Sequence, residues 1–141
     1  MYCRRNCRRT TGAALVELAL ILPLLILIVL GCVDFGRFAT SYTAVTNAAR
    51  EGANFGSTHP FTGTTQALWV QKITAAVTDE MSGIPGFSAD QMSVSEPTVI
   101  ASNDDARVRV EVTYTFQPAI RWPLLPQKVE ISRTAQMPIV R

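Results

Sequence analysis

The sequence predicts an α+β protein. A long N-terminal transmembrane helix is expected to continue into a small domain, where a second helix packs on a three- to four-stranded antiparallel sheet. Residues 13–33 hold 18 apolar residues out of 21, and helical periodicity continues beyond them. A second helical pattern covers residues 65–81, and apolar and polar side chains alternate within residues 92–140.

The apolar run at residues 13–33 is long enough to cross a membrane. Twenty-one helical residues span roughly 31 Å, close to the thickness of a bilayer's hydrocarbon core. Four arginines precede the run, whereas Asp34 and Arg37 follow it without net charge. This asymmetry predicts a cytoplasmic N-terminus and a translocated C-terminus. The expected divisions are therefore a basic cytoplasmic leader (1–12), a transmembrane helix (13–33) and an extracytoplasmic α+β domain (34–141).

Charge and composition exclude several classes of function. The chain carries 13 basic and 11 acidic residues, and its first 12 residues hold four arginines and no acid. The basic excess is thus a short head and does not indicate a nucleic-acid partner. Three cysteines form no disulfide framework, and His59 is the single histidine. We expect no catalytic, cofactor-binding or metal site, because no nucleophile has a base at a meaningful spacing.

Helical periodicity continues through residues 34–53. One stripe recurs at steps of three and four residues and is expected to face a core: Phe35, Phe38, Tyr42, Val45 and Ala49. The membrane helix is therefore expected to extend to about 40 residues. Residues 54–63 contain Gly56, Pro60 and Gly63 and are expected to form a loop that exposes His59.

The remaining elements follow from periodicity. In the helix at residues 65–81 the expected inner face is Leu68, Trp69, Ile73, Ala76 and Val77. The clearest strand covers residues 107–116, whose even-numbered positions are apolar. A strand at 94–100 precedes it across a turn at 102–105, and Pro97 assigns that strand to an edge. A further strand covers residues 128–137, with four inward side chains: Val129, Ile131, Ala135 and Met137.

Glu17 is an acidic residue inside the apolar run. It lies about one turn from the start of the run, so it could reach the lipid headgroups. Alternatively it is retained for a positively charged partner, the default interpretation of an ionisable group within a membrane. Cleavage after Gly12 would give Ala13 a new amine four residues before Glu17, in the same helix or near a neighbouring one.

The residues around this position resemble a known family. Arg8-Arg9-Thr10-Thr11-Gly12, followed by Ala13-Ala14-Leu15-Val16-Glu17-Leu18, resembles the cleavage region of type IV-type prepilins. The wider stretch is similar to the TadE-like pseudopilin family of the tight-adherence (Flp) pilus system over about residues 8–54. The motifs that carry this similarity are Val16-Glu17-Leu18-Ala19, Leu22-Pro23, Asp34-Phe35-Gly36-Arg37 and Ala48-Ala49-Arg50-Glu51-Gly52-Ala53.

The resemblance implies processing. A membrane-embedded prepilin peptidase would cut between Gly12 and Ala13, and Glu17 would be the acidic determinant of the mature chain. Leu18 stands where the family often has an aromatic residue. The implied function is to aid assembly or secretion of an adhesive Flp-type pilus. The implied location is the bacterial inner membrane, where the partners would be other pilins, pseudopilins and pilus assembly proteins.

Two other functions remain open at this stage. Val29-Leu30-Gly31-Cys32 approximates a lipobox, which would make the chain a lipoprotein acylated at Cys32. The chain could also be an unprocessed single-pass envelope protein whose outer domain binds a partner. The N-terminus of the mature chain distinguishes these possibilities.

Residues 117–126 form an apolar, proline-rich segment. It either folds back on the sheet or forms a contact surface, because tryptophan and arginine are enriched among interface anchors. The candidate interface residues are Ile120, Trp122, Leu124 and Leu125.

Overall fold

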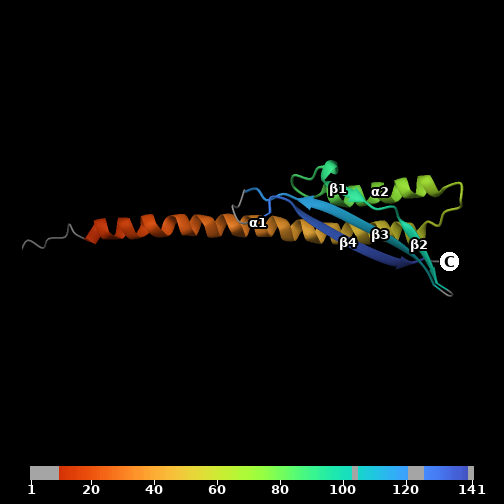
Figure 1. Cartoon of the computed structure of the whole chain (residues 1–141), viewed down its shortest axis with the longest axis horizontal. Helices are drawn as coiled ribbons and strands as arrows, with labels where there is room; N and C mark the ends of the chain where they lie inside the picture. The colour runs from red at the N-terminus through yellow and green to blue at the C-terminus, as the bar shows by residue number, and fades with distance from the viewer. Residues whose placement is uncertain (1–9, 103–104, 121–125, 140–141) are drawn as a thin grey trace, which may run out of the picture. The chain divides into compact units, whose positions relative to one another are not determined.

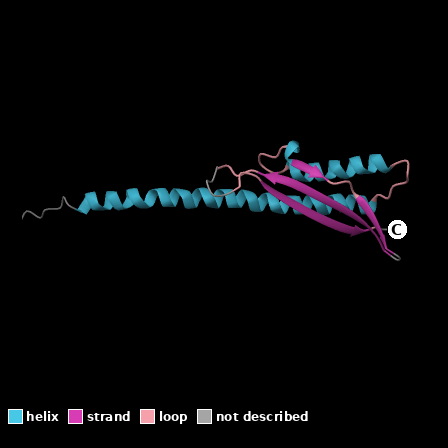
Figure 2. Cartoon of the chain, in the orientation of Figure 1, coloured by secondary structure: helices cyan, strands magenta, loops and turns pink. Residues whose placement is uncertain are grey.

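The computed structural model describes residues 10–102, 105–120 and 126–139. The chain divides into two compact units, residues 1–36 and residues 37–141. The sequence predicts a domain boundary at residue 34, and that division stays a prediction. Helices and strands are shown in Figure 1 and coloured by type in Figure 2.

Helix α1 (Thr10–Thr58) contains 49 residues and covers both helical segments expected from the sequence. Pro23 lies inside it. Because proline has no backbone N–H, the carbonyl of Ala19 loses its usual intrahelical donor, a defect that membrane helices tolerate. Side chains from residue 12 through residue 30 are exposed.

The part of α1 that belongs to the second unit buries small residues. Val45, Ala48 and Ala53 are each 0% exposed, and Ala49 is 1% exposed. The expected aromatic stripe is therefore wrong in part, because Phe35 is 73% and Tyr42 is 41% exposed. Burial follows the alanines and glycines instead, since small side chains let the helix approach its neighbours closely.

The end of α1 also differs from expectation. The loop expected from residue 54 begins only after Thr58, because the helix continues through Gly56. A Cβ added to Gly56 would lie 2.9 Å from Val108 Cγ1, 3.0 Å from Ile73 Cδ1 and 3.1 Å from Trp69 Cζ2. Close packing on three sides therefore holds a residue that has poor helix propensity by itself.

Helix α2 (Gln66–Ser82) confirms the second predicted helix. Its buried side chains are Trp69, Ile73, Val77 and Met81. The expectation for Leu68 was wrong: it is 52% exposed, while Met81 takes the inner position one turn after Val77. Beyond the helix, Gly86 has φ +80°, a conformation that favours glycine.

Strand β3 (Asp105–Phe116) lies at the centre of an antiparallel sheet. A short 3₁₀ helix, η1 (Ala89–Gln91), leads into β1 (Met92–Val94). Strands β2 (Thr98–Ser102) and β4 (Val129–Pro138) complete the described sheet. All three outer strands pair with β3, and the pairing of β3 with β4 runs from Arg107↔Pro138 to Phe116↔Val129.

Strands β1 and β2 share one edge of β3, because β4 occupies the other edge. Val94 pairs with Val112, and Thr98 pairs with Arg109, so three residues on this edge oppose two on β3. The single strand expected at 94–100 is thus wrong: a bulge containing Pro97 divides it, although its place at an edge is confirmed. Two residues of the turn expected at 102–105, residues 103 and 104, lie outside the described residues.

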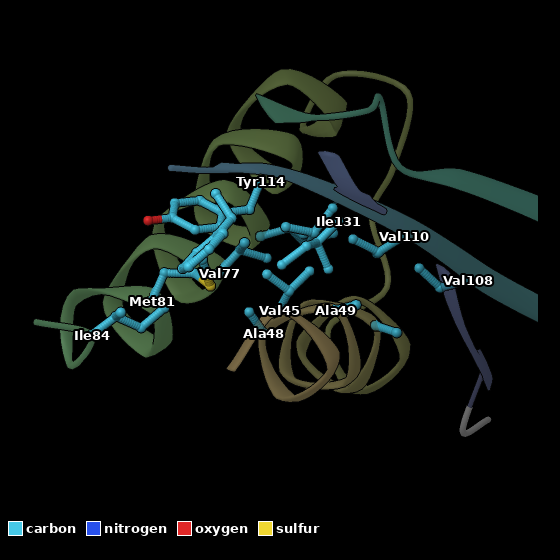
Figure 3. Packing of buried hydrophobic residues seen from close by; sticks show 14 of the residues in the cluster. Val45, Ala48, Ala49, Val77, Met81, Ile84, Val108, Val110, Tyr114 and Ile131 are labelled. Carbon is cyan, nitrogen blue, oxygen red and sulfur yellow. The ribbon is translucent and has the colours of Figure 1, made fainter. Parts of the chain in front are cut away.

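Both helices contribute to the core on one face of the sheet. Figure 3 shows Val45 and Ala49 of α1, Val77 of α2, and Val110 and Ile131 of the sheet gathered in one cluster. The even-numbered positions of β3 from 108 to 116 are all buried, as predicted. The fold class expected from the sequence, α+β with a long N-terminal helix and an antiparallel sheet, is confirmed (Figure 2).

The opposite face of the sheet is polar. Thr113 Oγ1 donates to Ser132 Oγ at 3.2 Å, and Ser132 Oγ donates to Glu111 Oε1 at 3.0 Å. Arg107 and Arg109 are exposed on the same face. A sheet with one apolar and one polar face is typical of antiparallel architecture.

Candidate processing segment and outer-domain surfaces

The predicted cleavage point lies near the start of α1. The helix begins at Thr10, so Gly12 and Ala13 occupy its first turn. A Cβ added to Gly12 would meet nothing within 4 Å. Packing within the described chain therefore does not require glycine at this position, and glycine weakens the helix locally by about 0.5–1 kcal/mol relative to alanine. Both properties are compatible with the predicted cleavage after Gly12, which stays a prediction.

Glu17 lies on the same face of α1 as Ala13, one helical turn further along. Leu18 follows it and is 56% exposed, while Val16 is 63% exposed. Glu17 is itself exposed. The carboxylate is thus surrounded along the helix by apolar side chains, where a charged group without a counter-charge would be costly in lipid.

The described residues contain one helix that is long and apolar enough to span a membrane. Its most apolar window has a mean hydropathy of 2.9 and no buried residue. An apolar helix that packs against no other element of the protein is typical of a membrane segment. Cys32 lies exposed within the continuous helix, whereas acylated cysteines of lipoproteins are usually followed by a flexible tether.

Two arginines contact aromatic rings between α1 and the sheet in the second unit. The guanidinium of Arg37 lies 5.7 Å from the ring centroid of Phe116, and Phe38 meets the same ring edge-on at 5.5 Å. The guanidinium of Arg133 lies 4.1 Å from the ring centroid of Tyr42. Arg133 occupies the core-facing side of an edge strand, and inward charges of this kind discourage pairing with other chains.

Tyr114 is a buried ionisable side chain whose pKa is shifted. Its side chain is 4% exposed, and its hydroxyl donates to Gln91 Oε1 at 3.2 Å. Burial raises the pKa of Tyr114 above its ordinary value of 10.0, and the positive charge of Arg37 opposes part of that rise. The residue is structural, because its buried ring stacks on the ring of Phe87.

A small aromatic pocket lies where the end of α1 and the start of α2 come together. Its volume is about 130 Å³. Phe55 stacks on His59 with centroids 4.3 Å apart, and Phe61 lies 4.5 Å from Trp69. The full lining is Phe55, His59, Pro60, Phe61, Thr65, Leu68, Trp69 and Lys72.

Sequence reasoning missed this pocket. His59 is exposed, as predicted, but its ring also lines the pocket. Trp69 is 5% exposed, and its Nε1 is buried without a hydrogen-bond partner among the described residues. The available signal was the concentration of aromatic residues between positions 55 and 69.

The candidate interface at residues 117–126 is described only in part. Ile120 is half-buried. Trp122, Leu124 and Leu125 lie outside the described residues, so the expectation for them stays a prediction. The described residues contain no group of three or more histidine, cysteine, aspartate or glutamate side chains that could hold a metal ion.

Comparison with known proteins finds a similarity for the N-terminal segment. The family model described as TadE-like protein matches residues 12–54. This segment is similar to TadE-like proteins. The match begins at Gly12 and covers the whole apolar run and most of the remaining part of α1. No curated protein and no solved structure matches the chain.

The TadE-like match confirms the family resemblance inferred from the sequence motifs. It indicates involvement in Tad/Flp pilus systems, and this family is not known for enzymatic activity. Together with the apolar helix it indicates membrane localisation.

Proposed function

We propose that this protein is a membrane-anchored pseudopilin that aids assembly or secretion of an adhesive Flp-type pilus after maturation by a prepilin peptidase. The observation that carries the proposal is the combination at the start of α1. In the first turn of this exposed helix, a glycine that packing does not require stands immediately before the apolar run, which contains one acid. The TadE-like match over residues 12–54 supports it.

Processing removes the basic leader from the cytoplasmic side of the inner membrane. The peptidase unwinds the first turn of α1 and cleaves between Gly12 and Ala13. The arginines of the leader keep this end in the cytoplasm, and the second unit is translocated. Leu18 continues the apolar surface immediately after the acid.

Cleavage then supplies the counter-charge that Glu17 needs. The new amine of Ala13 and the carboxylate of Glu17 are separated by four residues, which places them on one helix face. In a bundle of helices from several subunits, each charge offsets the desolvation of the other. Assembly with other pilins or pseudopilins would therefore depend on removal of the leader.

Co-expression with a prepilin peptidase tests the cleavage position. Gly12→Val should abolish removal of the 12-residue leader. Glycine has no Cβ and a freely variable backbone, whereas β-branched valine is bulkier and more restricted in a narrow protease cleft. Gly36→Val is the matched control, since a Cβ at Gly36 also meets nothing within 4 Å. Normal cleavage of Gly12→Val, or failure of both variants, would contradict the proposal.

A further inference from the structure

One end of the sheet lies beside the first residues of the second unit. Phe116 ends β3 and pairs with Val129, which begins β4. The guanidinium of Arg37 lies 5.7 Å from the ring centroid of Phe116, and Arg37 is the first residue of that unit. We call this end of the sheet, described at residues 116–120 and 126–129, the basal end.

Strand β3 runs from the basal end along the part of α1 that belongs to the second unit (Figure 1). At the other end of this stretch, a Cβ added to Gly56 would lie 2.9 Å from Val108 Cγ1. The helix from Arg37 to Gly56 advances about 29 Å over 19 residues. The strand from Val108 to Phe116 advances about 26 Å over eight residues. Because the two lengths agree, helix and strand stay side by side, and the basal end stays at the level of Arg37.

Chain length keeps the basal end close to the membrane that the apolar run crosses under the proposed function. The run ends at Val33, four residues before Arg37. Four residues advance about 6 Å as a helix and reach no more than about 14 Å when fully extended, whatever angle the two units adopt. The headgroup layer adds roughly 5–7 Å on each side of the hydrocarbon core. A chain anchored by this run therefore carries Arg37 in the lipid headgroups or just above them.

The charges at this level favour an anionic surface. Arg37 and Lys128 are both exposed, and the described residues of the basal end contain no acid. Asp34, the acid between the apolar run and Arg37, is 7% exposed and presents little of its side chain to the surroundings. Glu130, the first acid of β4, is exposed two residues after Lys128. A basic side chain close to an anionic membrane typically strengthens the contact about fivefold.

We propose that the basal end of the sheet docks on the headgroups of anionic phospholipids, where the ammonium of Lys128 and the guanidinium of Arg37 face lipid phosphates. The docked lipid surface is a partner for the part of the chain outside the hydrocarbon core, and it holds that part at the bilayer before assembly. The inference rests on the membrane anchor of the proposed function. It requires neither cleavage at Gly12 nor the charge pair of Glu17.

Fluorescence quenching tests the contact in the full chain, incorporated in lipid nanodiscs. The three native cysteines are replaced by serine, Gln127→Cys carries a fluorophore, and one lipid carries a nitroxide on its headgroup. The label at position 127 should be quenched. Gln136→Cys is the matched control, because Gln136 is also exposed but lies seven residues along β4 from Val129, about 23 Å. A label there should keep its fluorescence.

Lipid charge and two single substitutions then test the chemistry. Quenching at position 127 should increase when phosphatidylglycerol replaces part of the phosphatidylcholine, and it should decrease with added salt. Lys128→Gln should lower the ratio of docked to undocked chains about fivefold, whereas Glu130→Gln should leave that ratio unchanged or raise it. The Gly12→Val background should give the same quenching, which separates this test from that of processing. Near-UV circular dichroism verifies that each variant folds.

Co-elution with the nanodiscs is verified first, because a chain that fails to incorporate would overturn the membrane anchor and this contact with it. In chains that incorporate, the docking alone is overturned if the label at position 127 is not quenched, or if labels at positions 127 and 136 are quenched equally. Quenching that responds neither to phosphatidylglycerol nor to Lys128→Gln would also overturn it.

Discussion

The close approach of α1 to α2 and the sheet can be tested by adding one methyl group at Gly52. A Cβ there would lie 2.7 Å from Val77 Cγ2, 3.3 Å from Val110 Cγ1 and 3.4 Å from Ile73 Cγ2. Valine side chains are stiff at χ1, so Val77 cannot retreat without moving its helix. Overpacking of this kind costs about 1–3 kcal/mol, and the 2.7 Å contact places Gly52→Ala in the upper half of that range.

Helix propensity opposes this cost. Replacing glycine by alanine inside a helix gains about 1 kcal/mol, so the net destabilisation should be about 1–2 kcal/mol. For a unit of this size that lowers the melting temperature by about 5–10 °C. The assay is thermal unfolding of the full chain in detergent micelles, monitored by near-UV circular dichroism.

Gly36→Ala provides the matched control on the same helix. A Cβ at Gly36 meets nothing within 4 Å, so only the propensity gain remains and the melting temperature should be unchanged or raised. If Gly52→Ala melts at or above the wild-type temperature, α1 does not pack as closely as described, and the reasoning from Val77 is refuted.

Four other variants probe the core, its surface and the assembly signal. Ile73→Ala, at a position 0% exposed, should cost about 2–5 kcal/mol, whereas Leu68→Ala should change the free energy of unfolding by less than about 0.5 kcal/mol in urea titrations. Tyr114→Phe should cost about 1 kcal/mol through the lost hydrogen bond to Gln91. Because the pKa of Tyr114 is raised in the folded protein, its contribution to the free energy of unfolding is present below pH 10 and is lost as pH rises through the folded pKa. Above pH 10 the wild type should therefore lose stability relative to this variant. Parallel plots of unfolding free energy against pH for the two proteins would contradict this. Glu17→Gln should still be cleaved but should fail to support pilus formation, and normal piliation would exclude the charge-pair mechanism.

The sheet was largely predictable because its signal repeats. From Val108 to Phe116, every second residue of β3 is apolar, and each of these five side chains is buried. The break between β1 and β2 was not predicted, because a proline indicates an edge but does not reveal that the residues around it form a bulge. The register of β1 and β2 depends on how each of them pairs with β3. A local sequence pattern does not encode this long-range pairing.

The inner face of α1 was harder to predict for a different reason. Phe35 and Tyr42 carry a strong apolar signal, yet the helix buries Ala48, Gly52 and Ala53. Residues with little or no side chain contribute weakly to hydrophobic periodicity, although they permit the closest contacts. For the same reason the sequence predicts a loop at Gly56, although this residue lies inside the helix.

The candidate processing segment could be predicted from the sequence because its residues lie close together along the chain. The arginines, Gly12, Ala13 and Glu17 are close along the chain, so their relation required no tertiary structure. The aromatic pocket could not be found in this way, because it joins the end of one helix to the start of the next through side chains that also form ordinary core contacts.

We propose that cleavage before Ala13 turns an apolar helix with one acid into an assembly element. The most direct test is to determine the N-terminus of the protein isolated from its own cells. Mass spectrometry of that N-terminal peptide should find a chain that begins at Ala13. A chain that retains Arg4 through Arg9, or one that begins at an acylated Cys32, would contradict the account.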